Sequence, residues 1–218
     1  MKLYDTMIDL LADAKDRERE IRFIDGADKE SVLSFDELWD QALSLLGSLQ
    51  AHGMHPGDEL IIFSTSNKSF VVAFWAAVLG GIVPVPVAVG ISDEHKLKLF
   101  RILSQLEHPT LFTEMDLLQR LLDFAKEREL PDITELLDTH AVLMSDVEPG
   151  AHGAIHDARP DDIGFIQYSS GSTSDPKGIV LTHRNLCVNI RAIVEGFDWQ
   201  DDDQALSWMP LTHDMGLI

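Results

Sequence analysis

A polar segment between two apolar runs contains the residues of this chain that are best suited to bind a polyanion. Residues 168–178 read Tyr-Ser-Ser-Gly-Ser-Thr-Ser-Asp-Pro-Lys-Gly and lie between two largely apolar runs, residues 163–168 and 179–181. Small residues allow backbone N–H groups to point into a concavity, hydroxyls add donors, and Lys177 supplies a positive charge. A phosphate group suits such a segment; a plain polar turn between two strands is the alternative.

The order of residues in this segment differs from that of the phosphate loop of P-loop nucleotidases. That loop reads G-x-x-x-x-G-K-[ST], with a hydroxyl residue directly after the lysine to hold a magnesium ion. Here the lysine precedes its glycine, as Lys177-Gly178, and Ile179 follows. The sequence therefore predicts a phosphate-binding loop of another kind.

A second group of polar residues stands near the end of the sequence. Residues 207–218 read Ser-Trp-Met-Pro-Leu-Thr-His-Asp-Met-Gly-Leu-Ile. His213 and Asp214 invite assignment as an acid–base pair, yet adjacent residues on a strand point to opposite faces. We therefore do not predict such a pair, and a histidine that caps or packs at a strand end is the alternative for His213.

Together the two segments closely resemble signature motifs of the adenylate-forming (AMP-binding) superfamily. Acyl-CoA synthetases, luciferases and the adenylation domains of peptide synthetases belong to it. The run from His213 to Gly216 most resembles the fatty acyl-AMP ligase branch. Two residues depart from the family pattern: Ser174 stands where glycine is usual, and Thr212 stands where fatty acyl-AMP ligases commonly have tyrosine. If the chain at Ser174 needs a positive φ, a serine there is strained.

The resemblance implies an ATP-dependent ligase that activates a carboxylic acid. The carboxylate attacks the α-phosphorus of ATP to give an acyl-adenylate and pyrophosphate, and a thiol then takes the acyl group. It also implies that His213, as the catalytic site residue, lines the acyl pocket near the adenylate, and that Lys177 adds positive charge. The residues expected around the β- and γ-phosphates are Ser169, Ser170, Gly171, Ser172, Thr173 and Ser174.

The cofactors and partners follow from the same resemblance. ATP and Mg²⁺ are implied, with the metal ligand expected beyond residue 218 and no metal site within the chain. A fatty acid is the expected carboxylic acid, and an acyl carrier protein or coenzyme A the expected acceptor. An acyl-CoA synthetase or an amino-acid adenylation domain is the alternative within this class. A non-catalytic module that binds nucleotide or a partner protein is the alternative outside it. Lipid metabolism and polyketide or nonribosomal peptide biosynthesis are the expected settings.

Composition limits the partners further. The net charge is −20, from 17 basic and 37 acidic residues, which argues against nucleic acid and against an anionic membrane surface. The one cysteine, Cys187, is typical of a reducing compartment, and we expect a cytoplasmic protein. Residues 69–92 are uncharged, but their glycines and prolines would break a membrane-spanning helix. A buried helix that runs into a buried strand explains this stretch better.

Alternating helix and strand patterns predict the fold class. Strands are expected at residues 21–24, 59–63, 82–89, 110–112 and 141–144, and helices at 3–14, 34–52, 67–79, 92–106 and 113–127. Capping residues mark two of these helix starts: Ser34 with Glu37, and Thr113 with Asp116. The order indicates an α/β protein of βαβ units that form mostly parallel sheets flanked by helices. By resemblance it is the N-terminal portion of the adenylate-forming enzyme fold.

The expected organisation has two parts. Residues 1–162 form an N-terminal α/β subdomain that ends in a connecting loop, and residues 163–218 begin the nucleotide-binding part with the phosphate loop. The sequence stops within its second motif, on an apolar pair, so we expect a truncated piece of a longer enzyme that is inactive without the remainder.

Overall fold

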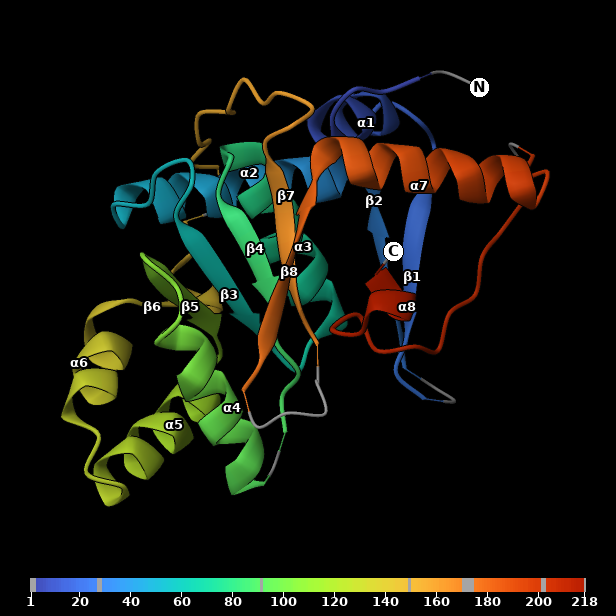
Figure 1. The fold of residues 1–218 in the computed structure, drawn as a ribbon. Coiled ribbons are helices and arrows are strands. Elements are labelled where there is room, and N and C mark those ends of the chain that lie inside the picture. The colour runs from blue at the N-terminus through green and yellow to red at the C-terminus, as the bar shows by residue number, and fades with distance from the viewer. Residues whose placement is uncertain are drawn as a thin grey trace.

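A four-stranded parallel sheet forms the centre of the fold in the computed structural model (Figure 1). The structure describes residues 3–26, 29–90, 92–148, 150–169, 175–200 and 203–217, apart from the Asp214 side chain. The strand order in the sheet is β4-β3-β5-β6. These strands are β3 (Glu59–Phe63), β4 (Val83–Pro86), β5 (Pro109–Thr113) and β6 (Ala141–Leu143).

Helices connect the parallel strands, as the alternating pattern predicts. One helix links β3 to β4, one links β4 to β5, and two link β5 to β6. They are α3 (Asn67–Gly80), α4 (Asp93–Leu103), α5 (Met115–Glu127) and α6 (Pro131–Thr139). The βαβ expectation is therefore confirmed.

Two antiparallel hairpins form separate two-stranded sheets, and four further α-helices and a short 3₁₀ helix (Met144–Asp146) complete the described elements. The first hairpin pairs β1 (Glu20–Ile24) with β2 (Glu30–Ser34), and the second pairs β7 (Ile163–Ser169) with β8 (Lys177–Thr182). Strand β7 lies beside β4 (Figure 1). The remaining helices are α1 (Met7–Ala14), α2 (Phe35–Ala51), α7 (His183–Gly196) and α8 (Asp214–Leu217).

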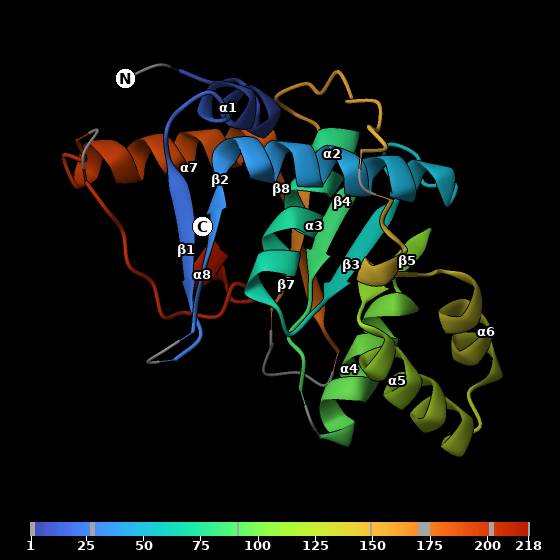
Figure 2. The same ribbon diagram turned by 180° about the vertical axis from the view of Figure 1, so that it is seen from behind.

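The alternation of side chains along β3 divides the core into two clusters. Leu60 and Ile62 point into a cluster built with α2 and α3, which lie together on one face of the sheet (Figure 2). Ile61 and Phe63 point into a second cluster, built with α4, α5 and α6. Because both faces of the strand are covered, its sequence reads as a continuous apolar run.

Strand β7 divides its side chains between the same two clusters. Phe165 has no exposed surface, and its ring meets that of Phe74 edge-on at a centroid distance of 5.7 Å. Ile166 and Tyr168 instead pack against the cluster of α4 and α5. Although β7 is hydrogen-bonded only to β8 among the described strands, its packing makes it part of the central layer.

Strand β8 is the exposed member of its hairpin. Ile179 and Val180, which point to opposite faces, are 52% and 51% exposed. Within the described ranges, β7 is its one strand partner. The middle of β8 is therefore open on both faces, whereas Leu181 near its end packs against the cluster of α2 and α3.

The predicted start of α2 is confirmed in detail. The Ser34 hydroxyl accepts a hydrogen bond from the Glu37 amide, and the Glu37 carboxylate accepts one from the Ser34 amide. These reciprocal bonds satisfy two N–H groups that the helix leaves without intrahelical partners. The helix ends with His52 as its C-cap, and Gly53 follows at φ +96°.

One predicted helix cap was wrong, and two elements were not predicted. Thr113 does not cap α5, because it still pairs with Phe63 as the last residue of β5. Glu114 is the N-cap residue instead, and its carboxylate accepts hydrogen bonds from the Ser64 hydroxyl and the Thr65 amide. Strand β2 and helix α6 were not predicted.

The uncharged stretch at residues 69–92 forms a buried helix and a buried strand. Nine residues of α3 are buried, and all four residues of β4 are buried. Across the described ranges, no helix is both long enough and apolar enough to cross a membrane. The uncharged sequence therefore reflects enclosure of α3 within the protein.

The predicted connecting loop contains no helix or strand between residues 150 and 162, but it packs closely on other elements. The Gly153 amide donates to the Leu43 carbonyl oxygen, and the His156 amide donates to the Leu79 carbonyl oxygen. A Cβ on Gly153 would overlap the Gly47 amide nitrogen, so the loop depends on glycine for this approach to α2. The division into residues 1–162 and 163–218 stays a prediction.

The packing of β7 leads to a stability prediction. We expect Phe165→Ala to lower the free energy of unfolding by about 3–5 kcal/mol, because the fully enclosed ring leaves a cavity. Phe197→Ala is the control, since Phe197 is 75% exposed, and it should change stability by less than about 0.5 kcal/mol. Urea unfolding followed by circular dichroism measures both, and equal losses would contradict the described packing of β7.

Candidate functional site

The β7–β8 hairpin brings the two ends of the predicted phosphate segment together. Ser169, the last residue of β7, is paired in register with Lys177, the first residue of β8. The Ser169 hydroxyl lies 3.5 Å from the Lys177 carbonyl oxygen. Five of the predicted residues lie outside the described ranges, and their phosphate contacts stay predictions: Ser170, Gly171, Ser172, Thr173 and Ser174.

The strands place this segment at a defined edge of the molecule. β7 ends, and β8 begins, at the same end of the layer as the carboxyl ends of β3 and β4 (Figure 1). In open α/β sheets, ligands bind beyond the carboxyl ends of the strands. The side chain of Lys177 is exposed there, and no carboxylate of the described residues forms an ion pair with it. Its charge is therefore available to an anion.

Tyr168 and Gly178 form a close contact next to this pair. A Cβ added to Gly178 would come within 3.2 Å of Cζ of the Tyr168 ring and 3.0 Å of Ile166. The glycine that follows the lysine thus leaves room for the tyrosine ring at the base of the segment. Burial, with a further contribution from the charge of Glu59, raises the pKa of the Tyr168 phenol. We therefore expect this tyrosine to stay neutral.

The His213 segment forms a tight turn that leads into α8. The His213 amide donates to the Pro210 carbonyl oxygen at 3.0 Å, and the Met215 amide donates to His213 Nδ1 at 3.3 Å. A Cβ on Gly216 would overlap the Pro210 carbonyl oxygen, so the turn requires a glycine there. The expectation of a strand at His213 and Asp214 was wrong, because this turn and α8 replace it.

Gln167 joins the two predicted motifs. Its side chain is buried in β7, two residues before Ser169, and its Nε2 donates to the Thr212 carbonyl oxygen at 3.2 Å. His213 follows directly and has an exposed side chain. Among the predicted site residues within the described ranges, the fold therefore brings Ser169, Lys177 and the His213 segment to one region.

His183 fastens the base of the hairpin to the N-terminal helix. It is the first residue of α7, is 2% exposed, and its Nδ1 accepts a hydrogen bond from the Met7 amide at 3.1 Å. The His183 amide in turn donates to the Asp162 carbonyl oxygen at 3.1 Å. Burial lowers the pKa of His183, although the charges of Asp162 and Asp9 oppose this shift. A neutral imidazole is what the bond from Met7 requires, since Nδ1 must be the acceptor.

A surface ion pair holds the same junction from outside. The guanidinium of Arg184 donates from Nε and Nη2 to the two carboxylate oxygens of Asp161, at 2.7 and 2.9 Å. The Arg184 side chain lowers the pKa of Asp161 by its hydrogen bonds. Both groups are exposed, so water and salt screen the pair and its contribution to stability is small.

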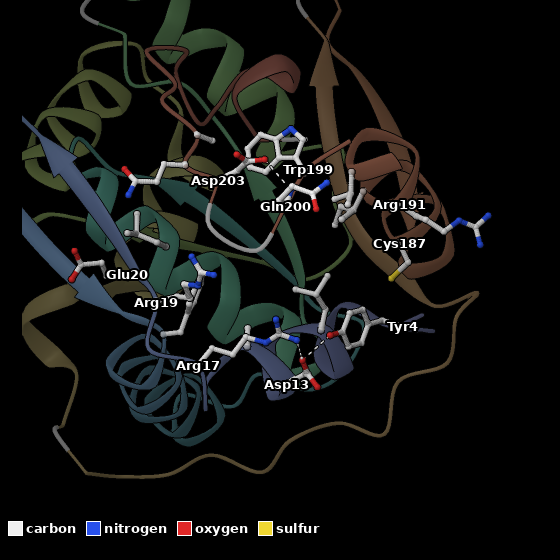
Figure 3. A pocket seen from close by; sticks show the side chains of 18 of the residues that line it. Tyr4, Asp13, Arg17, Arg19, Glu20, Cys187, Arg191, Trp199, Gln200 and Asp203 are labelled. Atoms are coloured by element: carbon white, nitrogen blue, oxygen red, sulfur yellow. Dashed lines mark hydrogen bonds and ion pairs between the residues drawn. The ribbon is translucent and has the colours of Figure 1, made fainter. Parts of the chain in front are cut away.

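A wide groove lies away from this region (Figure 3). It has a volume of about 2400 Å³ and is lined by residues of α1, β1, α7 and residues 203–206. Ser169, Lys177 and His213 are not among its lining residues. Small-molecule sites usually measure about 300–1,000 Å³, and we assign no ligand to this larger groove.

The side chains along the groove do not form a reactive centre. The Tyr4 hydroxyl and the Arg17 guanidinium both donate to Asp13, each at 2.7 Å (Figure 3). Burial raises the pKa of the Cys187 thiol, and the charges of Asp9 and Asp5 raise it further. This thiol therefore stays protonated at neutral pH and is a poor nucleophile.

Within the described ranges, no group of three or more His, Cys, Asp or Glu side chains has the geometry of a metal site. A Mg²⁺ ion takes carboxylate and phosphate oxygens in octahedral geometry. We therefore derive no catalytic step through a metal in this chain.

Sequence reasoning missed two residues that organise the site. Gln167 is the only polar side chain between Ile163 and Tyr168, and a polar residue within an apolar run that forms a strand was the available signal. His183 gave no comparable signal, because its burial depends on α1, which lies 176 residues away along the chain.

Three kinds of comparison with known proteins agree with one another. The family model described as "AMP-binding enzyme" matches residues 11–218. A long-chain-fatty-acid–AMP ligase, FadD32 of Mycolicibacterium smegmatis, is 29% identical over 202 residues, which are 90% of this chain and 31% of the relative. The medium-chain-fatty-acid–[acyl-carrier-protein] ligase JamA of Moorena producens is 28% identical over 226 residues, which are 99% of this chain and 37% of the relative.

A solved structure extends the likeness to three dimensions. The adenylation domain of a keto acid-selecting NRPS module, bound to a keto acyl adenylate, has a TM-score of 0.88 and 28% identity. The match covers 99% of this chain and 40% of that chain. The chain spans about a third of the length of the curated relatives it matches. Its architecture is that of the N-terminal part of adenylation domains.

The buried His183 leads to a prediction about pH. Because burial lowers the pKa of His183 below the ordinary histidine value of 6.5, the unfolded chain takes up a proton there before the folded protein does. The contribution of His183 to stability is thus fully present above pH 6.5 and declines as the pH falls from 6.5 towards the lowered pKa. The decline is at most about 1.4 kcal/mol per pH unit, the limit for one proton.

Urea unfolding of the wild type, His183→Gln and His152→Gln between pH 5 and 8 measures this effect. The stability difference between the wild type and His183→Gln should shrink below pH 6.5. The His152→Gln variant should keep the wild-type pH profile, because His152 is exposed. A His183→Gln profile parallel to the wild type throughout would show that His183 is not held neutral.

Proposed function

We propose that this chain, which belongs to the AMP-binding enzyme family, forms the phosphate-binding side of an adenylating active site. The reaction would join a carboxylic acid to AMP and release pyrophosphate. The observation that carries this proposal is the pairing of Ser169 with Lys177 across the β7–β8 hairpin, with the His213 segment held beside β7.

The chemistry suits such an arrangement. Displacement at phosphorus depends mainly on positioning the reactants and on neutralising negative charge. Lys177 would supply positive charge to the departing pyrophosphate, and Ser169 with residues 170–174 would supply hydrogen-bond donors. The chain carries a net charge of −20, so a polyanion approaches against a repulsive field. Local donors are therefore essential for binding.

His213 would act next to the acyl group. Its imidazole is exposed, and the hydrogen bond from the Met215 amide makes Nδ1 the acceptor. Nε2 is then the ring nitrogen that would donate to a bound adenylate oxygen. The turn from Pro210 to Gly216 holds the ring in this orientation.

A fatty acid is the proposed carboxylic acid, and a carrier protein the proposed acceptor. Relatives named as fatty acyl-AMP ligases and as an acyl-carrier-protein ligase support this choice. A putative acyl-CoA synthetase and adenylation domains of peptide synthetases are also similar to the chain. Coenzyme A as acceptor and an amino acid as substrate therefore remain the alternatives, and a cytoplasmic location remains a prediction.

Full catalysis is proposed for a protein of the relatives' length. The chain spans about a third of that length, and no group of three or more metal-binding side chains lies within its described residues. We propose that the metal ligands and the remaining adenylate contacts come from sequence that corresponds to the other two thirds. A non-catalytic nucleotide-binding module is the alternative of another class, favoured by Ser174 and Thr212.

Phosphate binding can be tested with the chain itself. We expect Thr173→Ala combined with Lys177→Ala to weaken binding of inorganic pyrophosphate at least tenfold, because a charge and a hydroxyl donor are lost. Isothermal titration calorimetry at low ionic strength gives the affinities. Lys126→Ala, at an exposed position of α5, is the matched control for charge and should bind as the wild type does. Unchanged affinity in the double variant would sink the phosphate assignment.

Catalysis gives a separate prediction. We expect the 218-residue chain alone to show no exchange of labelled pyrophosphate into ATP in the presence of fatty acids. The reason is that the chain spans only about a third of the length of the ligases it resembles. Fatty-acid-dependent exchange by this chain would contradict the division of labour proposed here.

A further inference from the structure

Gln167 is a buried side chain that satisfies only half of its hydrogen-bonding capacity. It is 8% exposed and lies on the same face of β7 as the fully buried Phe165. Its Nε2 donates to the Thr212 carbonyl oxygen, 45 residues further along the chain. Its Oε1 is buried and accepts no hydrogen bond from any described residue.

The orientation of this amide follows from its partner. The Thr212 carbonyl oxygen can only accept a hydrogen bond, so the NH₂ end of Gln167 must face it. Turning the amide over would bring two oxygens together and lose the bond. The unpartnered atom is therefore the oxygen.

Gln50 offers a comparison, because both ends of its side-chain amide form hydrogen bonds. Its Nε2 donates to the Ala154 carbonyl oxygen, and its Oε1 accepts from the Ala154 amide, both at 2.8 Å. Both ends of that amide are satisfied by a single residue of a surface loop. Gln167 contacts its segment through the donor alone, at the cost of a buried acceptor.

An apolar residue would fill the position of Gln167 without that cost. Its neighbours in β7, Phe165 and Ile166, are apolar, so the strand does not need a polar side chain in order to pack. The stabilising interaction that Gln167 provides is its hydrogen bond to Thr212. Gln167 lies two residues before Ser169, and Thr212 directly precedes His213, so this bond ties the His213 segment to the end of β7.

We infer that Gln167 is a positioning residue, which holds the His213 segment against the strand that leads into the phosphate segment. The purpose of this positioning rests on the proposed function, since it concerns the relative placement of the acyl-binding and phosphate-binding sides. The experiment that tests it does not depend on that function, because it measures the His213 segment directly.

Hydrogen–deuterium exchange read by mass spectrometry tests this role. The variant is Gln167→Met, which keeps the length and volume of the side chain and removes the donor. The amides of His213, Gly216 and Leu217 make the hydrogen bonds of the turn and of α8. We expect them to exchange at least tenfold faster in Gln167→Met, while the amides of β3 keep their rates.

Gln50→Met is the matched control, because it removes a glutamine bond to a backbone carbonyl elsewhere. It should speed exchange near Ala154 and leave residues 210–217 unchanged. Wild-type rates at 210–217 in Gln167→Met would overturn the inference. So would equal acceleration throughout the chain, since that would indicate a general loss of stability.

Gln167→Glu adds a readout that packing alone would not move. A buried carboxyl group has a raised pKa, and only its protonated form can donate to the Thr212 carbonyl. We expect protection of residues 210–217 in this variant to return as the pH falls from 8 to 5. Rates are corrected for intrinsic exchange and compared with Gln167→Met at each pH, so that effects of His183 and His213 cancel. Equal protection in both variants at every pH would overturn the inference.

Pyrophosphate binding by the wild type separates the two claims. If the wild type does not bind pyrophosphate but Gln167→Met frees the segment, the proposed function fails and the positioning role stands. If the wild type binds pyrophosphate and the segment is unaffected in Gln167→Met, the positioning role fails and the proposed function stands.

Discussion

The burial of β7 between two hydrophobic clusters is the constraint on which the candidate site depends. Phe165 packs in one cluster and Ile166 packs against the other, so a slip by one residue would send each side chain to the opposite face. This register fixes the end of the strand at Ser169 and brings Lys177 opposite to it. The two ends of the polar segment are thereby held by the core.

The two ends of the hairpin have different supports. At the end where the polar segment joins the two strands, the Gln167 amide donates a hydrogen bond to the Thr212 carbonyl oxygen, and Gly178 leaves room for the Tyr168 ring. At the base, His183 takes a hydrogen bond from α1, so the first helix of the chain shares in placing the hairpin. Residues at opposite ends of the sequence therefore act on the same strand pair. A change in α1 that breaks the hydrogen bond from Met7 to His183 would therefore remove one support of the β7–β8 hairpin.

Much of the fold could be predicted from the sequence, because its parallel strands and amphipathic helices have strong local signals. The capping box at Ser34 and the buried run at 59–63 were read correctly, since both depend on neighbouring residues alone. The cap expected at Thr113 failed because tertiary pairing with Phe63 kept that residue in the strand. Pairing between distant segments has no local signature, which is why a cap pattern was misleading there.

The candidate site could be predicted less completely than the fold. Motif resemblance predicts Ser169, Lys177 and His213 as site residues, and the fold places all three in one region. It did not identify Gln167 or His183, whose roles arise from contacts over 45 and 176 residues of sequence. It also suggested a strand at His213, where the Pro210 carbonyl and Gly216 impose a turn. The long-range hydrogen bonds of Gln167 and His183 could not be predicted, because no local sequence pattern indicates them.

The exposed strand β8 has a practical consequence for anyone who handles this chain. From Gly178 to Leu181 it carries no charge and no proline, and Ile179 and Val180 are open on opposite faces. Native proteins usually protect a free strand edge with charges, prolines or bulges, because an open edge can pair with that of another molecule. At high concentration, the molecules would therefore tend to join edge to edge into extended sheets, and the repulsion of twenty net negative charges would be the main force against it. The solubility of the chain should accordingly fall as added salt screens that charge.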